Sequence, residues 1–129
     1  MTTLTEARMI VVERDGYKCV CCDASVIGRP YSLGYRLQAA YGGRPVPSNL
    51  LTLLDRCRKR IDSAVDPQDE ANGYRLGPGQ DPALIPVMYA GGFRAWLTDD
   101  GALLYEAPTG AFAAAAVQLL AERGTSSLN

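Results

Sequence analysis

Four cysteines constrain this chain more than any other feature: three crowd into residues 19–22 and the fourth stands at position 57. Cys19 and Cys22 have the C-x-x-C spacing that brings two sulfurs to one point on a tight turn. Residues 1–6 lack a secretory signal, so we expect a cytoplasmic chain, in which such cysteines are typical of metal ligands or buried thiols rather than disulfides. The pattern predicts a cysteine-bearing turn packed against the element that carries Cys57.

Composition limits the chemistry. The chain has 129 residues, one domain's worth, and 13 basic against 14 acidic side chains give a net charge of −1. This balance excludes a globally basic nucleic-acid binder but permits a local basic patch. No apolar run approaches the roughly 20 residues needed to span a bilayer. Histidine is absent, so any mechanism that requires an imidazole as metal ligand or general base is excluded.

Hydrophobic periodicity in the first half predicts helices around one short strand. A capping box at Thr3 and Glu6 begins a helix that ends near Arg14. A strand is expected over residues 31–35, followed by a loop rich in Gly and Pro. Ser48 or Asn49 is expected to cap a second helix, whose apolar stripe comprises Leu50, Leu53, Leu54, Cys57, Ile61 and Ala64.

The second half predicts a short helical turn over residues 67–72 and then four short strands, at 74–76, 85–89, 93–98 and 102–106. Asp99-Asp100-Gly101 indicates a tight hairpin turn between the last two strands. A nearly all-apolar helix is expected over 111–122. We therefore predict one α+β domain over residues 1–129, with a core at 5–64, a strand-rich extension at 74–106 and a C-terminal helix at 110–124.

Several short motifs also follow one another in a characteristic order. The helix ends in Arg-Asp-Gly, a Tyr-x-Cys-x-x-Cys turn follows, and a Gly-Gly loop precedes a helix that carries a cysteine. Each motif alone is weakly specific. In chain order they are Arg14-Asp15-Gly16, Tyr17 to Cys22, Gly42-Gly43, Asn49-Leu50-Leu51-Thr52-Leu53, Cys57, Asp81 to Val87 and Trp96 to Gly101.

Together, over roughly residues 5–106, these motifs resemble the HNH endonucleases of the ββα-metal type, particularly small versions from actinobacteria and their phages. The resemblance implies a ββα centre, duplex DNA as a partner and a phage or mobile-element origin. In that family a His-His or Asp-His pair binds the catalytic metal and activates water, an Asn braces the loop, and a last His completes the metal site. The matching positions here are Gly34, Tyr35, Asn49 and Arg58.

These positions lack the chemistry of hydrolysis. Glycine has no side-chain ligand, a tyrosine phenol has a pKa of about 10, and a guanidinium has no lone pair for a metal. The resemblance also implies a structural zinc held by cysteines at 19, 22, 54 and 57, but position 54 is Leu54. We therefore predict no cofactor, with residual zinc at Cys19, Cys22 and Cys57 as the alternative and Cys21 or Asp55 as its fourth ligand.

The sequence favours a non-catalytic protein, a pseudonuclease that binds DNA or a protein partner. The alternatives are an interaction module or homo-oligomer, and a metal-dependent nuclease with an atypical site in which Asp66, Asp69 and Glu70 share a cation. We expect the host cytoplasm if the chain is phage-encoded, and no membrane partner. The expected DNA contacts are Arg36, Arg44, Arg56, Arg58, Lys59 and Arg60, and the expected protein interface is Phe112, Ala116, Leu119 and Leu120.

Overall fold

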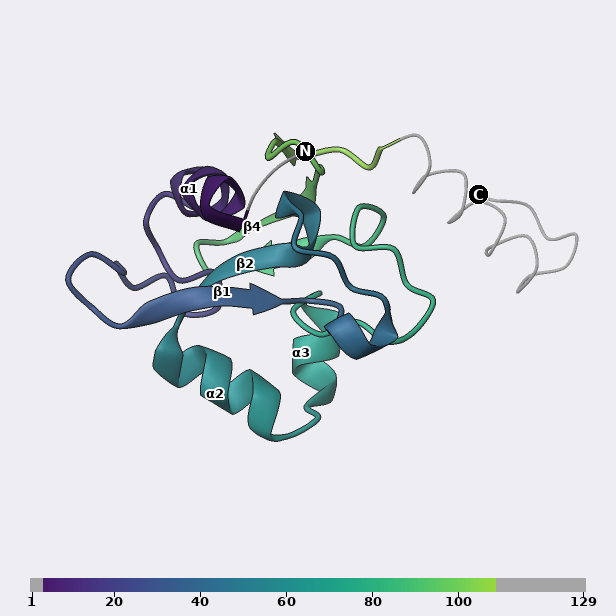
Figure 1. Ribbon diagram of the computed structural model, residues 1–129, viewed down its shortest axis with the longest axis horizontal. Helices are drawn as coiled ribbons and strands as arrows, with labels where there is room; N and C mark the ends of the chain where they lie inside the picture. Colours follow the sequence, from purple (N-terminus) through teal and green to yellow (C-terminus); the bar gives the residue numbers. More distant parts are fainter. Residues whose placement is uncertain (1–3, 109–129) are drawn as a thin grey trace, which may run out of the picture.

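An antiparallel hairpin of two strands lies at the centre of the computed structural model, which describes residues 4–108. Strand β1 (Tyr31–Tyr35) pairs with β2 (Leu50–Leu54), from Tyr31 opposite Leu54 to Tyr35 opposite Leu50. Helix α1 (Leu4–Arg14) lies on one side of this hairpin and α2 (Asp55–Ser63) on the other (Figure 1). The described chain is therefore a mixed α+β structure with small antiparallel sheets.

The expected helix from residue 49 is wrong over Leu50–Leu54, which forms β2, so α2 begins only at Asp55. All five β2 residues are buried, since both faces of the strand are covered. A short apolar run that is buried on both sides has no alternation, and periodicity alone cannot separate it from a helix. The predictions of α1 and of a strand at 31–35 are confirmed.

Apolar side chains from both sides of the hairpin form the core. On the α1 side, Ala7 and Val11 pack against Leu33 and Leu50. The larger cluster lies on the other side and includes Leu51, Leu53, Cys57 and Ile61 together with residues of the second sheet. The hairpin is thus fixed from both faces, and its β1 edge has no neighbouring strand in the described part of the chain.

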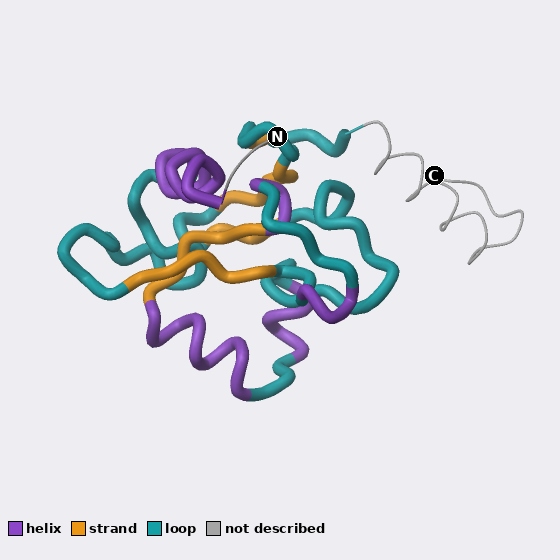
Figure 2. Tube along the Cα trace, viewed as in Figure 1, coloured by secondary structure: helices purple, strands orange, loops and turns teal. Residues whose placement is uncertain are grey.

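The second sheet has the order β3 (Val87–Tyr89), β4 (Phe93–Leu97) and β5 (Leu103–Leu104). The hairpin predicted at 99–101 joins β4 to β5, and Gly101 supplies a φ of 95° there. The helical turn predicted after residue 66 is α3 (Pro67–Ala71), but residues 74–76 form no strand. Figure 2 shows that loops connect most of these short elements.

The predicted C-terminal helix and its interface residues, Phe112, Ala116, Leu119 and Leu120, lie outside the described residues.

Two short 3-10 turns, η1 (Ala39–Tyr41) and η2 (Pro47–Asn49), shape the loop between β1 and β2. None of the helices between residues 4 and 108 is long and apolar enough to cross a membrane.

A buried ionic network ties α1 to both sheets. The Asp15 carboxylate accepts hydrogen bonds from Arg14 Nε at 2.9 Å, from the Thr52 N–H at 3.0 Å and from the Tyr89 hydroxyl at 2.6 Å. Arg14 also donates to the carbonyl oxygens of Pro47 and Leu50, each at 2.7 Å. Every charge in this network is paired, which is the condition for burying ions at tolerable cost.

Burial of Tyr89 predicts a loss of stability in alkali. Burial raises the pKa of Tyr89 above its ordinary value of about 10. Above pH 10 the unfolded chain therefore loses this proton while the folded chain keeps it, so the free energy of unfolding falls as pH rises. The Tyr89→Phe variant should show a slope shallower by about 1.4 kcal/mol per pH unit in urea titrations between about pH 10 and 11.5. Equal slopes would contradict this assignment.

Candidate functional site

The cysteine turn and α2 bring three sulfurs together, as the spacing predicted. The turn is closed by hydrogen bonds from the Cys19 N–H to the Ala24 carbonyl and from the Asp23 N–H to the Cys19 carbonyl, each at 2.8 Å. Cys57 points at this turn from the buried face of α2. The Sγ atoms of Cys19, Cys22 and Cys57 all lie within 4.8 Å of one another.

The surroundings of these sulfurs favour a thiolate at Cys19. A hydrogen bond from the Cys21 thiol lowers the pKa of Cys19 to about 4, despite its burial, and the Leu54 N–H also donates to Cys19 Sγ at 3.4 Å. The same Cys21–Cys19 hydrogen bond raises the pKa of Cys21, and burial raises that of Cys57. Arg56 Nη2 lies 4.0 Å from Cys22 Sγ, so a cation also faces the exposed end of the cluster.

The donor set fits a thiophilic ion. A zinc–sulfur bond is about 2.3 Å long, so sulfurs that share one zinc lie about 3.8 Å apart in a tetrahedral site. The observed sulfur spacing needs only a small contraction to reach this geometry. Cys19, Cys22 and Cys57 could therefore hold a metal ion, and among the described residues no other group of three His, Cys, Asp or Glu side chains does so.

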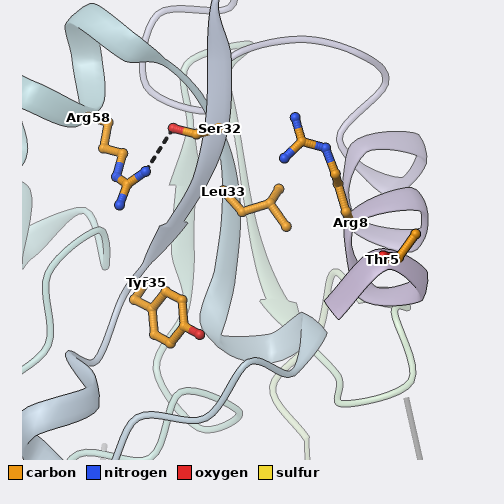
Figure 3. A pocket seen from close by; sticks show the side chains of 6 residues that line it. All are labelled: Thr5, Arg8, Ser32, Leu33, Tyr35 and Arg58. Atoms are coloured by element: carbon orange, nitrogen blue, oxygen red, sulfur yellow. Dashed lines mark hydrogen bonds between the residues drawn. The ribbon is translucent and has the colours of Figure 1, made fainter. Parts of the chain in front are cut away.

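A second candidate site is a cavity of about 360 Å³ at the open edge of β1. α1, β1 and α2 each contribute to its walls, and Arg8 and Arg58 reach toward β1 from opposite sides (Figure 3). The described lining residues supply cations, hydroxyls and one apolar side chain, without a carboxylate, and are Thr5, Arg8, Ser32, Leu33, Tyr35 and Arg58.

Hydrogen bonds and ring contacts position both arginines. Arg58 Nη1 donates to Ser32 Oγ at 3.0 Å, and its Nε lies 3.5 Å from the Asp62 carboxylate one turn along α2. The Arg8 guanidinium lies over the ring of Tyr31, 4.9 Å from its centroid. Both guanidiniums stay partly exposed, so an anion in the cavity could contact them.

The positions marked by the family resemblance divide between this cavity, the core and the loop between β1 and β2. Tyr35 and Arg58 line it. Gly34 is buried, and a Cβ there would lie 2.6 Å from Leu53 Cδ1, so any larger side chain would displace Leu53. Asn49 braces the loop as expected, because its amide bonds the Leu37 N–H at 2.7 Å and the carbonyls of Leu37 and Arg44 at 3.0 Å.

The predicted DNA-contacting residue Arg36 is buried, and this expectation is corrected. The side chain is fully inaccessible and donates to the carbonyls of Gly73, Ser48, Pro82 and Ile85 at 2.6–2.8 Å. It therefore joins the loops that follow β1 and α3 instead of facing solvent. Nothing in the sequence around Arg36 separates an internal arginine from a surface one, since its partners are backbone atoms far along the chain.

The other predicted basic residues divide between two surfaces, because consecutive helical residues point about 100° apart. Arg58 faces β1, whereas Arg56 and Arg60 face the cysteine turn. Lys59 is exposed on α2, and Arg44 is exposed beside Asp99, with 3.6 Å between the charged atoms. Arg60 forms a two-pronged ion pair with the buried Asp69, both bonds at 3.0 Å.

This pairing removes the expected cation site at the acidic residues near α3. The Asp69 carboxylate forms an ion pair with Arg60. Asp66 caps α3 by accepting a hydrogen bond from the Gln68 N–H at 2.9 Å. These two carboxylates serve the helix start and an ion pair, and they do not converge with Glu70 on a cation.

Sequence reasoning missed Arg8, Ser32 and Thr5 as lining residues. Helical periodicity gives the exposed face of α1, but only the packing of α1 beside β1 places Arg8 opposite Arg58.

Comparison with protein-family models, with curated proteins and with solved structures found no match to this chain. The residues of the two candidate sites are therefore the basis for inferring its function.

Proposed function

We propose that this chain is a catalytically inactive protein with an HNH-like ββα centre that binds the phosphates of duplex DNA at the β1 edge. The observation that carries the proposal is that Arg8 from α1 and Arg58 from α2 line one cavity whose other polar groups are hydroxyls. Guanidinium groups bind phosphate oxygens through paired N–H donors, and hydroxyls donate to the same oxygens. The cavity thus offers the chemistry of anion binding.

Hydrolysis needs more than this cavity supplies. Cleavage of a phosphodiester on such a centre requires a divalent metal and a base that activates water. The lining offers guanidinium, hydroxyl and phenol groups, and the chain has no imidazole. Arg58 would replace a bound cation by a fixed positive charge, which keeps the attraction for phosphate without the chemistry.

Neighbouring charges set the expected strength of binding. Lys59 adds an exposed positive charge on α2, whereas Arg56 faces the cysteine turn and Asp55 and Asp62 lie beside Ser32 and Arg58. With a net charge of −1 for the chain, attraction at long range is weak. We therefore expect binding that is clear at low salt and falls steeply as salt rises.

Three features support the HNH-like part of the proposal. The order β1, β2, α2 gives two antiparallel strands followed at once by a helix. Asn49 braces the loop between the strands, and the cysteine turn meets Cys57 on α2. The predicted interaction surface of residues 111–121 lies outside the described residues. If the chain does not bind duplex DNA even at low salt, the alternative of a protein-interaction module is favoured.

Arg58→Gln and Arg8→Gln are expected to weaken binding to a labelled duplex, because each removes one guanidinium that would neutralise a phosphate. The slope of log affinity against log salt should fall in magnitude by about 0.9 for each phosphate that is no longer neutralised. Fluorescence anisotropy over a series of salt concentrations measures both quantities.

Arg94→Gln is the matched control, since it changes the charge equally but lies on β4, where Arg94 stacks on Trp96 and lines no part of the cavity. Equal reductions of affinity in all three variants would indicate a general charge effect and would contradict the proposed cavity. Unchanged affinity in the Arg8 and Arg58 variants would do the same.

A further inference from the structure

The cysteine cluster carries an inference that is independent of DNA binding. Three sulfurs form a triangle, yet a closed zinc site has four protein ligands. The family resemblance implies a fourth cysteine at position 54, just before the helix that carries Cys57. This position is Leu54, which is buried in the apolar core. A fourth protein ligand must therefore come from another side chain that lies beside the three sulfurs.

Asp55 and Cys21 are the two nearby candidates, and the geometry separates them. The Asp55 carboxylate accepts a hydrogen bond from Ser32 Oγ at 3.2 Å, which directs it toward β1. The Cys21 thiol instead contacts the thiols of both Cys19 and Cys57. Cys21 is half-buried on the turn and packs against the core cluster that contains Cys19 and Cys57, although its Sγ is not one of the three that lie within 4.8 Å of one another, so its side chain would have to turn toward the ion.

Charge around the cluster also suits four thiolates. A divalent ion with four thiolates carries a net charge of −2, which needs compensation when it is partly buried. Arg56 Nη2 lies 4.0 Å from Cys22 Sγ, and Arg60 Nη2 lies 3.9 Å from Cys21 Sγ. The Asp69 ion pair fixes Arg60 in this place. Cations thus face the sulfurs of both Cys21 and Cys22.

We propose that Cys21 supplies the fourth thiolate of a structural zinc site formed with Cys19, Cys22 and Cys57. Three ligands then come from one tetrapeptide and one from α2. The ion would cross-link the cysteine turn to the first turns of α2, beside the hairpin that carries the DNA-binding cavity. Thiolate ligands select Zn²⁺ over the hard cations Mg²⁺ and Ca²⁺.

Cobalt substitution in the reduced, metal-stripped full chain tests this ligand set. The native chain should bind one Co²⁺ with tetrahedral visible bands, and Cys21→Ser should lose about one quarter of the sulfur-to-cobalt charge-transfer absorbance because one of four metal–sulfur bonds is gone. Competition with a chromophoric chelator should show Zn²⁺ affinity reduced by about 100-fold or more, beyond the range typical of outer-shell changes. Asp55→Asn is the matched control and should leave both readouts unchanged.

Alkylation of the native chain covers the case in which Cys21→Ser fails to fold. Without metal, iodoacetamide should modify the exposed Cys22 quickly and the half-buried Cys21, whose pKa is raised, more slowly, and Zn²⁺ should lower both rates, as read by mass spectrometry over time. Modification of Cys21 at its metal-free rate while Cys22 is protected would overturn the proposal. Full cobalt absorbance in Cys21→Ser, a loss in Asp55→Asn, or no metal binding by the native chain would overturn it equally.

Discussion

Replacing Arg36 by methionine is expected to lower the free energy of unfolding by at least about 3 kcal/mol, because each buried carbonyl left without a donor costs about 1–3 kcal/mol. Arg36 donates to four carbonyls contributed by two loops, the one between β1 and β2 and the one between α3 and β3. Methionine fills a similar volume without any donor, so the carbonyls of Gly73, Pro82 and Ile85 lose the partner that holds their loop against β1. Urea denaturation at neutral pH measures the change.

Two opposing effects act at Arg36, and their balance determines whether Arg36→Met raises or lowers the free energy of unfolding. Burial lowers the pKa of Arg36 to about 9, so the side chain remains a cation at neutral pH and bears a desolvation cost that methionine removes. Four short hydrogen bonds from this charged donor to carbonyl oxygens outweigh this saving, because each is stronger than a bond between neutral groups. Arg36→Lys should recover only part of the loss, since an ammonium lacks the planar fork.

Arg44→Met is the control for this prediction. Arg44 is mostly exposed and its ion pair with Asp99 is a surface pair, so the change should stay within about 1 kcal/mol. Limited proteolysis gives a second readout, because residues 73–86 should be cleaved faster in Arg36→Met than in the native chain. Equal stability of the Arg36 and Arg44 variants would contradict the bracing role.

Asp15→Asn should cost about 3–5 kcal/mol of unfolding free energy, the range for removing one partner of a buried ion pair. The substitution keeps the shape but leaves the buried Arg14 guanidinium without a counter-charge. Both oxygens of Asp15 accept hydrogen bonds, from Arg14, Thr52 and Tyr89. In asparagine an NH₂ group replaces one of these oxygens, so it would place a donor against a donor. Thermal and urea unfolding measure the loss.

Asp62→Asn is the matched control, because Asp62 forms an exposed i,i+4 pair with Arg58 and should contribute less than about 1 kcal/mol. Tyr89→Phe removes one bond to the same carboxylate and should fall between the two variants. If Asp15→Asn unfolded with the free energy of Asp62→Asn, the network would not be what joins α1 to β2 and β3.

Local signals in the sequence predicted local features. The α1 helix, the β1 strand, the α3 turn and the β4–β5 hairpin follow from capping, alternation and turn residues close in the chain. The meeting of Cys57 with the C-x-x-C turn also followed, because helical periodicity pointed Cys57 inward. β2 was missed because a run of leucines buried on both faces carries no period.

Features that depend on long-range packing could not be predicted in this way. Arg36 and Arg58 are equally basic in the sequence, yet one is enclosed by loop carbonyls and the other lines a cavity. Arg8 entered the site only because α1 packs beside β1. The distinction between Cys21 and Asp55 likewise rests on which side each side chain faces, and that is fixed by the hydrogen bond between Ser32 and Asp55.

Titration of a labelled duplex of about 20–30 base pairs, two to three helical turns, tests the central claim most directly. The full chain is added in Mg²⁺ at low and moderate salt, anisotropy reports binding, and a denaturing gel reports the integrity of both strands. We expect binding that weakens steeply with salt while the duplex remains uncut. Cleavage that stops with chelator, or no binding even at low salt, would contradict a DNA-binding pseudonuclease.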